Sequence, residues 1–265
     1  MSVSLRAGVA SETGAYRDVN QDAAFAAAWG AGVADGVGGG PAGDLASAAL
    51  LHRLVAGGQR VPNAEALAVR VRGANWDLGA HVRRDPSLAG MATTLTTVWL
   101  ALDGSLLLAH TGDSRAYRLR VGHLTRQTRD DSYVQALIER GLVRPEDAMT
   151  HPQRNIITAS LRGGERDLVH VAASVPTVGD RWMICSDGVS DYLPDDAIAE
   201  VVAGIAEPQT VAEYVVALAL QAGSRDNVTA VIADVVDAAP AMPIGSVTFA
   251  GAASARFTED LTLAG

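Results

Sequence analysis

The chain has 265 residues, of which 48% are hydrophobic and 19% are charged, and this composition excludes an intrinsically disordered protein. Its formal net charge is −9, from 30 acidic and 21 basic residues. That balance argues against non-specific nucleic-acid binding, which needs a basic surface.

The sequence contains no uninterrupted apolar run of about 18 residues, the length that a membrane helix requires. The first ten residues lack the basic segment and apolar core of a signal peptide. The single cysteine, Cys185, cannot form an internal disulfide, and its apolar neighbours predict a place in the core. We therefore expect a cytoplasmic protein that binds neither membranes nor nucleic acid.

Strand and helix patterns follow one another in separate runs along the chain. The first part predicts strands at Ser4–Ala10, Ala23–Trp29 and Gly32–Asp35, helices at Pro41–Ala56 and Asn63–Arg84, and strands at Thr94–Ala101, Ser105–Thr111 and Ala116–Leu119. The later part predicts strands at Leu168–Ala172 and Arg181–Ser186, helices at Asp195–Ala203 and Pro208–Gly223, and a last strand at Val228–Val235. Several strands are near-continuous apolar runs, which is typical of strands covered on both faces.

This segregated order favours an α+β fold over alternating βαβ units. We expect residues 1–239 to form one domain, with two packed antiparallel sheets flanked by helices on both sides. The segment 125–164 is polar and broken, contains a short amphipathic piece at Tyr133–Arg140, and is predicted to be a flap inserted between strands. Residues 240–265 are rich in Ala, Gly, Ser and Thr and are predicted to be a mobile tail, with a short strand at Ser246–Phe249 as the alternative.

Aspartates recur where apolar strand patterns begin or end. They are Asp22, Asp35, Asp113, Asp187 and Asp226, most of them next to a glycine. Turn chemistry explains any one of them, because Asp and Gly are common turn residues. Their recurrence at the ends of apolar strands instead indicates a convergent acidic pocket, whose self-repulsion hard divalent cations would relieve. The absence of a His or Cys cluster with zinc-like spacing favours Mg²⁺ or Mn²⁺ over zinc.

The same residues carry a resemblance to a known family. The motifs are Arg17-x-x-Asn20-Gln21-Asp22, Asp35-Gly36-Val37-Gly38-Gly39, Gly112-Asp113-Ser114-Arg115, Ser186-Asp187-Gly188 and Asp226-Asn227, with lesser ones at Gly90–Thr94 and Asn155–Leu161. In this order and approximate spacing they resemble the PP2C-type (PPM) metal-dependent protein serine/threonine phosphatases, in their bacterial form. The resemblance covers about residues 4 to 236.

The resemblance implies an α-β-β-α sandwich with a metal site at one end that holds two or three Mn²⁺ or Mg²⁺ ions. By analogy with the family, Asp35 would bridge two metals, with the Gly36 carbonyl completing one of the shells. Asp187 and Asp226 would ligate the first metal, and Asp22 would hold water bound to the metals. Asp113 would contribute to a third metal site, and Arg17 would grip the substrate phosphate.

Such a site would hydrolyse phosphoserine and phosphothreonine with a hydroxide that bridges the metals, without a phosphoenzyme. An arginine suits the phosphate because its guanidinium binds phosphate oxygens as a bidentate fork and stays charged; the alternative for Arg17 is an ordinary ion pair with Asp18 or Asp22. Many family members carry a proposed general acid, a histidine, directly after the bridging Asp-Gly. This sequence has Val37 there, so the proton donor must be another group.

Several alternatives and partners complete the expectations. A catalytically inert relative acting as a binding or sensing module would predict lost metal ligands, yet Asp35, Asp187 and Asp226 are all present. A different metal-dependent hydrolase would leave Arg17 and the motif order unexplained. We expect a monomer that acts on phosphorylated proteins, including a cognate serine/threonine kinase and its targets. Ser132–Arg140 of the flap is our hypothesis for a specificity element, and His110 is expected to be a core residue rather than a ligand.

Overall fold

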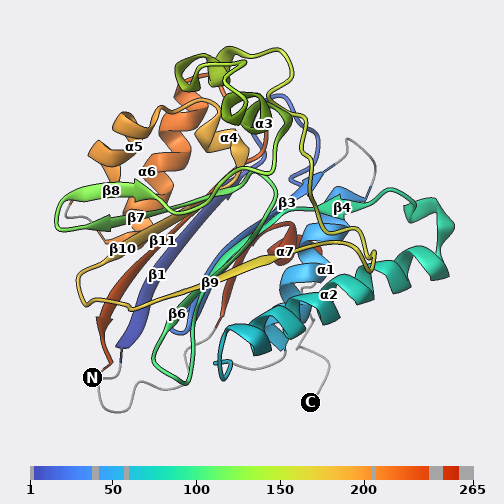
Figure 1. Ribbon diagram of the computed structural model, residues 1–265, viewed down its shortest axis with the longest axis horizontal. Helices are drawn as coiled ribbons and strands as arrows, with labels where there is room; N and C mark the ends of the chain where they lie inside the picture. Colours follow the sequence, from blue (N-terminus) through green and yellow to red (C-terminus); the bar gives the residue numbers. More distant parts are fainter. Residues whose placement is uncertain (1–2, 38–41, 57–59, 205–206, 239–246, 257–265) are drawn as a thin grey trace, which may run out of the picture.

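The computed structural model describes residues 3–37, 42–56, 60–204, 207–238 and 247–256. Two sheets pack face to face between layers of helices, which confirms the α+β sandwich (Figure 1). One sheet has the strand order β1 (Val3–Glu12), β11 (Val228–Asp237), β10 (Arg181–Cys185), β7 (Arg115–Arg120) and β8 (His123–Arg126). The other has the order β12 (Thr248–Gly251), β2 (Asp22–Ala27), β3 (Gly30–Val37), β5 (Leu95–Leu100), β6 (Leu106–Thr111) and β9 (His170–Ser174), with the short β4 (Ala92–Thr93) paired to β3. All pairings within the two sheets are antiparallel.

Helices cover the outer face of each sheet. The first sheet is covered by α5 (Asp195–Val202) and α6 (Pro208–Gln221), and the second by α1 (Gly43–Ala56), α2 (Ala64–Arg84) and α7 (Ala252–Arg256). Two shorter helices, α3 (Tyr133–Glu139) and α4 (Asp187–Ser190), lie at one end of the strands together with a 3-10 turn at Pro145–Thr150 (Figure 1). A second 3-10 turn, Pro86–Leu88, follows α2. None of the helices described is long and apolar enough to cross a bilayer.

The alternation of side chains along the strands explains the apolar runs. On β10, Trp182 and Ile184 pack between the sheets, whereas Met183 and Cys185 pack beneath α5 and α6. Because both faces of the strand are buried, the four positions from Trp182 to Cys185 are all apolar and show no polar alternation. Cys185 is fully buried, as predicted.

The structure corrects the expected boundaries at the flap and at the tail. Residues 125 and 126 belong to β8, so the flap begins later than predicted. The tail was expected to be mobile, but 247–256 are described, and β12 pairs with β2 before α7 packs on α1. The alternative of a short strand is therefore the better description; residues 239–246 and 257–265 lie outside the described part. Without β12, β2 would be an edge strand with unpaired backbone groups.

Candidate metal and phosphate site

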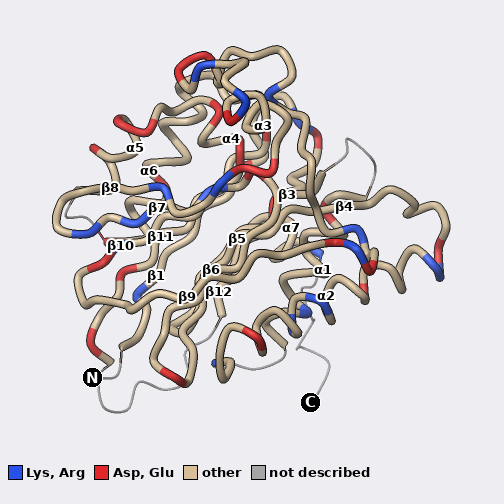
Figure 2. The backbone as a smooth tube through the Cα atoms, in the orientation of Figure 1, with Lys and Arg blue, Asp and Glu red and all other residues tan. Residues whose placement is uncertain are grey.

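The predicted aspartates gather where strand ends from both sheets meet. Asp22 and Asp35 are direct partners across the β2–β3 pair. Asp187 follows β10 as the first residue of α4, and Asp226 precedes β11 by two positions. Acidic segments lie beside α3 and α4 at this end of the strands (Figure 2). The site therefore combines one pair of strands from each sheet.

Asp22 is buried and held by its neighbours. The Ser186 hydroxyl donates a 2.7 Å hydrogen bond to Asp22 Oδ2, and the Asp22 amide donates to Asn20 Oδ1 at 3.0 Å. Burial raises the pKa of the Asp22 carboxyl to about 6, although hydrogen bonds from Ser186 and Thr229 oppose the rise. This environment suits a carboxylate that hydrogen-bonds water near a cation.

Asp35 and Asp187 are the most strongly perturbed carboxyls of the site. Burial is the main cause, followed by the charges of neighbouring aspartates, and the pKa of each rises well above its usual range. Asp187 Oδ1 is buried and has no hydrogen-bond partner among the described residues. A buried carboxylate oxygen without a partner is costly, so the position of this atom suits a cation or a hydrogen-bond donor.

The backbone around Asp35 is fixed by two threonines and two glycines. The Asp35 amide donates to Thr94 Oγ1 at 3.0 Å, and the Thr93 hydroxyl donates to the Asp35 carbonyl oxygen at 2.9 Å. A Cβ on Gly36 would lie 2.3 Å from the carbonyl oxygen of Gly43. The first turn of α1 thus approaches the strand end so closely that only glycine fits there.

Arg17 is paired with one of the predicted metal ligands. Its Nη2 lies 2.6 Å from Asp226 Oδ2, so the partner is neither Asp18 nor Asp22. Asn227 holds the loop that carries Arg17, because its side chain accepts from the Gln21 amide and donates to the carbonyls of residues 13 and 19. The Asp226-Asn227 motif therefore provides an acid and positions the arginine beside it.

Asp113 forms a separate buried position on the flap side of the site. Burial raises its pKa to about 7, and the charges of Asp130 and Asp191 add to the rise. Asp191 accepts a hydrogen bond from Arg154 of the flap at 3.1 Å. Asp191 was missed in the sequence, although it stands four residues after Asp187, a spacing that places two residues on one side of a helical turn.

The donor set consists of carboxylate oxygens and one backbone carbonyl, which fits hard divalent cations. In the part of the chain that the structure describes, no three His, Cys, Asp or Glu side chains are close enough together to hold one ion. One required carboxylate, Asp226, is engaged by Arg17. Asp187 Oδ1 nevertheless has no hydrogen-bond partner among the described residues, and burial together with neighbouring aspartates raises the pKa of Asp35 and of Asp187. Such carboxylate oxygens are the ligands that Mg²⁺ and Mn²⁺ prefer.

Comparison with known proteins gives the family. No family model matches the chain. It is 41% identical over 236 residues to the serine/threonine protein phosphatase PstP of Mycobacterium tuberculosis, covering 88% of this chain and 45% of that protein. It is 30% identical over 213 residues to the serine/threonine phosphatase stp of Listeria monocytogenes, covering 76% of this chain and 82% of that protein. The chain belongs to the PP2C-type (PPM) family of serine/threonine phosphatases.

The solved structures of the PP2C-type family share the fold. The catalytic domain of PstP, crystallised with two manganese ions, superposes with a TM-score of 0.80 at 38% identity, covering 89% of this chain and all of that one. This chain spans less than half the length of full-length PstP. The resemblance that the five motifs carried is thus confirmed at the level of family and fold.

Proposed function

We propose that this PP2C-type chain hydrolyses phosphoserine and phosphothreonine in proteins, with Mn²⁺ or Mg²⁺ as its cofactor. The observation that carries the proposal is the gathering of buried carboxylates around Asp187 Oδ1, which no other described residue hydrogen-bonds, with Arg17 beside them. The names of the curated relatives and the two manganese ions in the PstP catalytic domain support it.

The chain's own residues divide the work of holding cations. Asp35, Asp187, Asp226 and the Gly36 carbonyl would hold two ions, and Asp113, joined by Asp191, would hold a third. Asp22 would orient water beside them. When bound, such ions neutralise charge on the phosphate and lower the pKa of water. Burial and the neighbouring aspartates raise the pKa of Asp35 and of Asp187 well above the usual range, and bound cations would oppose that rise.

Arg17 would bind the substrate phosphate. Its side chain is 43% exposed, and its guanidinium reaches the rim of the acidic site through Asp226. Exchange of Asp226 for phosphate oxygens would free that carboxylate for metal and place the arginine on the substrate. The leaving alkoxide needs a proton, and Val37 cannot supply it. Water or another group of the site must therefore protonate the product.

Phosphorylated proteins, including a cognate kinase, are the partners we propose for a monomeric enzyme. The flap would select among them. Replacing Ser132–Arg140 by the corresponding segment of a relative should alter phosphopeptide preference while leaving turnover of a small aryl phosphate nearly intact. A parallel loss of both would make the segment structural.

The decisive experiment measures hydrolysis of p-nitrophenyl phosphate and of a phosphothreonine peptide, with and without Mn²⁺. Wild type should show Mn²⁺-dependent turnover, and Asp187→Asn should lose it while its circular dichroism spectrum stays unchanged. Absence of turnover by wild type with any divalent ion would favour the inert binding or sensing module instead.

A further inference from the structure

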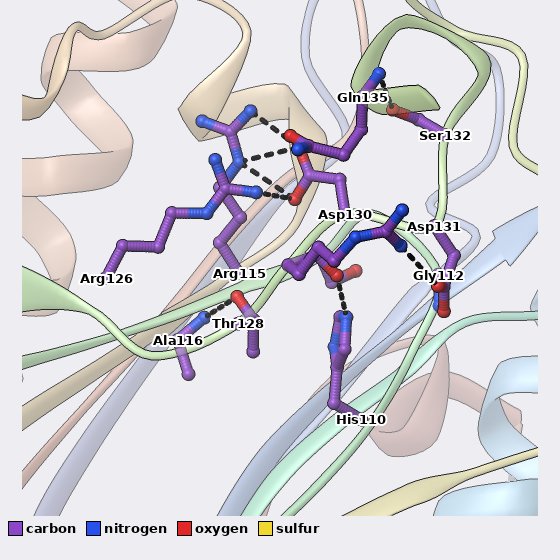
Figure 3. Close-up of polar contacts among 12 residues, drawn as sticks. His110, Gly112, Arg115, Ala116, Arg126, Thr128, Asp130, Asp131, Ser132 and Gln135 are labelled. Carbon is purple, nitrogen blue, oxygen red and sulfur yellow. Dashed lines mark hydrogen bonds and ion pairs between the residues drawn. The ribbon is translucent and has the colours of Figure 1, made fainter. Parts of the chain in front are cut away.

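The N-terminal end of the flap contacts the body of the protein through residues 128–131, which we name the flap root. The flap root lies against the turn between β6 and β7 that carries Asp113 (Figure 3). The Asp131 amide donates to the Gly112 carbonyl at 2.7 Å, and the Gly112 amide donates to Asp131 Oδ2 at 3.1 Å. Thr128 Oγ1 accepts from the Ala116 amide at 3.1 Å. The flap root and the Asp113 turn therefore form one hydrogen-bonded unit.

Ion pairs hold a second side of the flap root. Arg115 donates to Asp130 through Nε and Nη2, the latter at 2.8 Å, and Arg126 also contacts Asp130 (Figure 3). Asp130 is buried, so these charged contacts are shielded from water. The pairs fix Asp130 against β7 and β8. The carbonyl oxygen of Arg129, the residue before Asp130, has a different partner.

His110 contacts that carbonyl. It lies on β6, is 6% exposed, and its Nε2 is 2.8 Å from the Arg129 carbonyl oxygen (Figure 3). Its Nδ1 is 2.9 Å from Thr96 Oγ1. A carbonyl oxygen only accepts, so Nε2 carries the proton. Burial lowers the pKa of His110, which keeps the ring neutral and leaves Nδ1 as an acceptor.

A chain of polar contacts continues from His110 to Asp35. Thr96 Oγ1 is 3.0 Å from the Ser114 carbonyl oxygen, and Ser114 Oγ is 2.8 Å from Thr94 Oγ1. The latter atom accepts from the Asp35 amide. The side chains of Thr94, Thr96, His110 and Ser114 are all buried. With Nδ1 as an acceptor, the single hydroxyl proton of Thr96 can go to Nδ1 or to the Ser114 carbonyl oxygen, so the two contacts share one proton.

We propose that His110 is a positioning residue that fixes the flap root relative to Asp35 and thereby sets recognition of phosphoproteins. The proposal rests on the phosphatase function proposed above and on the flap as the specificity element. A small aryl phosphate does not need the flap, so its turnover is independent of His110. Turnover of a phosphopeptide long enough to reach the flap depends on the position of the flap root.

Two substitutions test separately the contacts made by the two ring nitrogens of His110. Glutamine can place its amide nitrogen near the position of Nε2 and donate to the Arg129 carbonyl. Asparagine is shorter, so it can reach Thr96 but not the flap root. His110→Gln therefore keeps the contact that the proposal needs, and His110→Asn loses it. Both are polar, neutral and smaller than histidine, which makes them matched controls for burial.

The first test measures KM and kcat of both variants for a phosphothreonine peptide and for p-nitrophenyl phosphate, with saturating Mn²⁺. One lost hydrogen bond corresponds to a change of about twofold to tenfold. His110→Asn should raise the peptide KM by that factor, with unchanged kinetics on p-nitrophenyl phosphate. His110→Gln should stay close to wild type on both substrates. Equal losses on both substrates, or identical behaviour of the two variants, would overturn the proposal.

The second test needs no activity. Trypsin cleavage after Arg140 or Arg154 reports opening of the flap. His110→Asn should be cut about twofold to tenfold faster than wild type and His110→Gln should not. Equal cleavage of all three proteins would overturn the positioning role even if the enzyme were inactive. If trypsin cuts His110→Asn faster than wild type but the wild type shows no phosphatase activity, the positioning role stands and only the proposed function is refuted.

Discussion

Arg17 and Asp226 form an ion pair 2.6 Å long between the expected phosphate ligand and an expected metal ligand. The two residues are 209 positions apart in the chain and meet because the Asp22 and Asp226 loops lie at one end of the sandwich. A metal ion and a phosphate would each compete for one member of this pair. Under the proposed function, the pair would therefore couple metal binding to substrate binding.

Removal of Arg17 should affect the two ligands in opposite directions. Arg17→Ala frees Asp226 and removes a nearby positive charge, so Mn²⁺ should bind more tightly by up to about fivefold, the range of a partly exposed ion pair. The same variant should lose about tenfold to a hundredfold in kcat/KM for a phosphopeptide, because a charge-assisted contact to phosphate is lost. Isothermal titration with Mn²⁺ and steady-state kinetics measure the two effects. Weaker Mn²⁺ binding by Arg17→Ala would contradict the competition.

Stability of the chelated protein should fall as the pH rises. The folded pKa values of Asp22 and Asp113, about 6 and about 7, exceed the unfolded value of roughly 3.9. The folded state therefore binds more protons, and the stabilisation, fully present below pH 4, is lost as the pH rises through 6 and 7. Urea unfolding with chelator should show a loss of a few kcal/mol between about pH 5 and pH 8.

Saturating Mn²⁺ provides the control for that measurement. Bound cations replace the protons on these carboxyls, so the loss of unfolding free energy between about pH 5 and pH 8 should be much smaller. Titratable groups far from the site should contribute equally with and without metal. Asp113→Asn should also remove part of the fall in the chelated protein. An identical pH dependence with and without Mn²⁺ would mean that these carboxyls do not bind the metal.

The sequence allowed the strand ends and their aspartates to be predicted because both signals are local. An apolar run that stops at Asp-Gly is visible in a few residues, as at Asp35 and Asp187. The Arg17–Asp226 pair was not predictable, since nothing local joins residues so far apart. Asp191 was missed because α4 has a single turn and shows no periodicity. The strand β12 contains Thr, Phe, Ala and Gly, and its pairing with β2 depends on register rather than on pattern.

Two glycine substitutions should change stability with opposite signs. A Cβ on Gly188 would lie 1.9 Å from the Asn227 carbonyl oxygen, whereas a Cβ on Gly73, inside α2, would meet nothing within 4 Å. Gly188→Ala should therefore destabilise the protein by about 3 kcal/mol and weaken Mn²⁺ binding, because it separates Asp187 from Asp226. Gly73→Ala should stabilise it by about 0.5–1 kcal/mol through helix propensity. Thermal unfolding of both variants checks the signs, and equal behaviour would refute the close approach at Gly188.

The C-terminal element should contribute to stability through Phe249. The ring of Phe249 stacks on His52 of α1, with centroids 4.2 Å apart, and His52 Nε2 lies 2.7 Å from the Ala253 carbonyl oxygen of α7. Phe249→Ala should lose about 2 kcal/mol, because it removes half-buried apolar surface and an aromatic pair. The exposed neighbour Thr248→Ala should change the free energy of unfolding by less than about 0.5 kcal/mol. Equal effects of the two substitutions in urea unfolding would show that β12 and α7 do not depend on this contact. Where Phe249→Ala releases β12, β2 becomes an edge strand, and the variant should aggregate more readily than wild type.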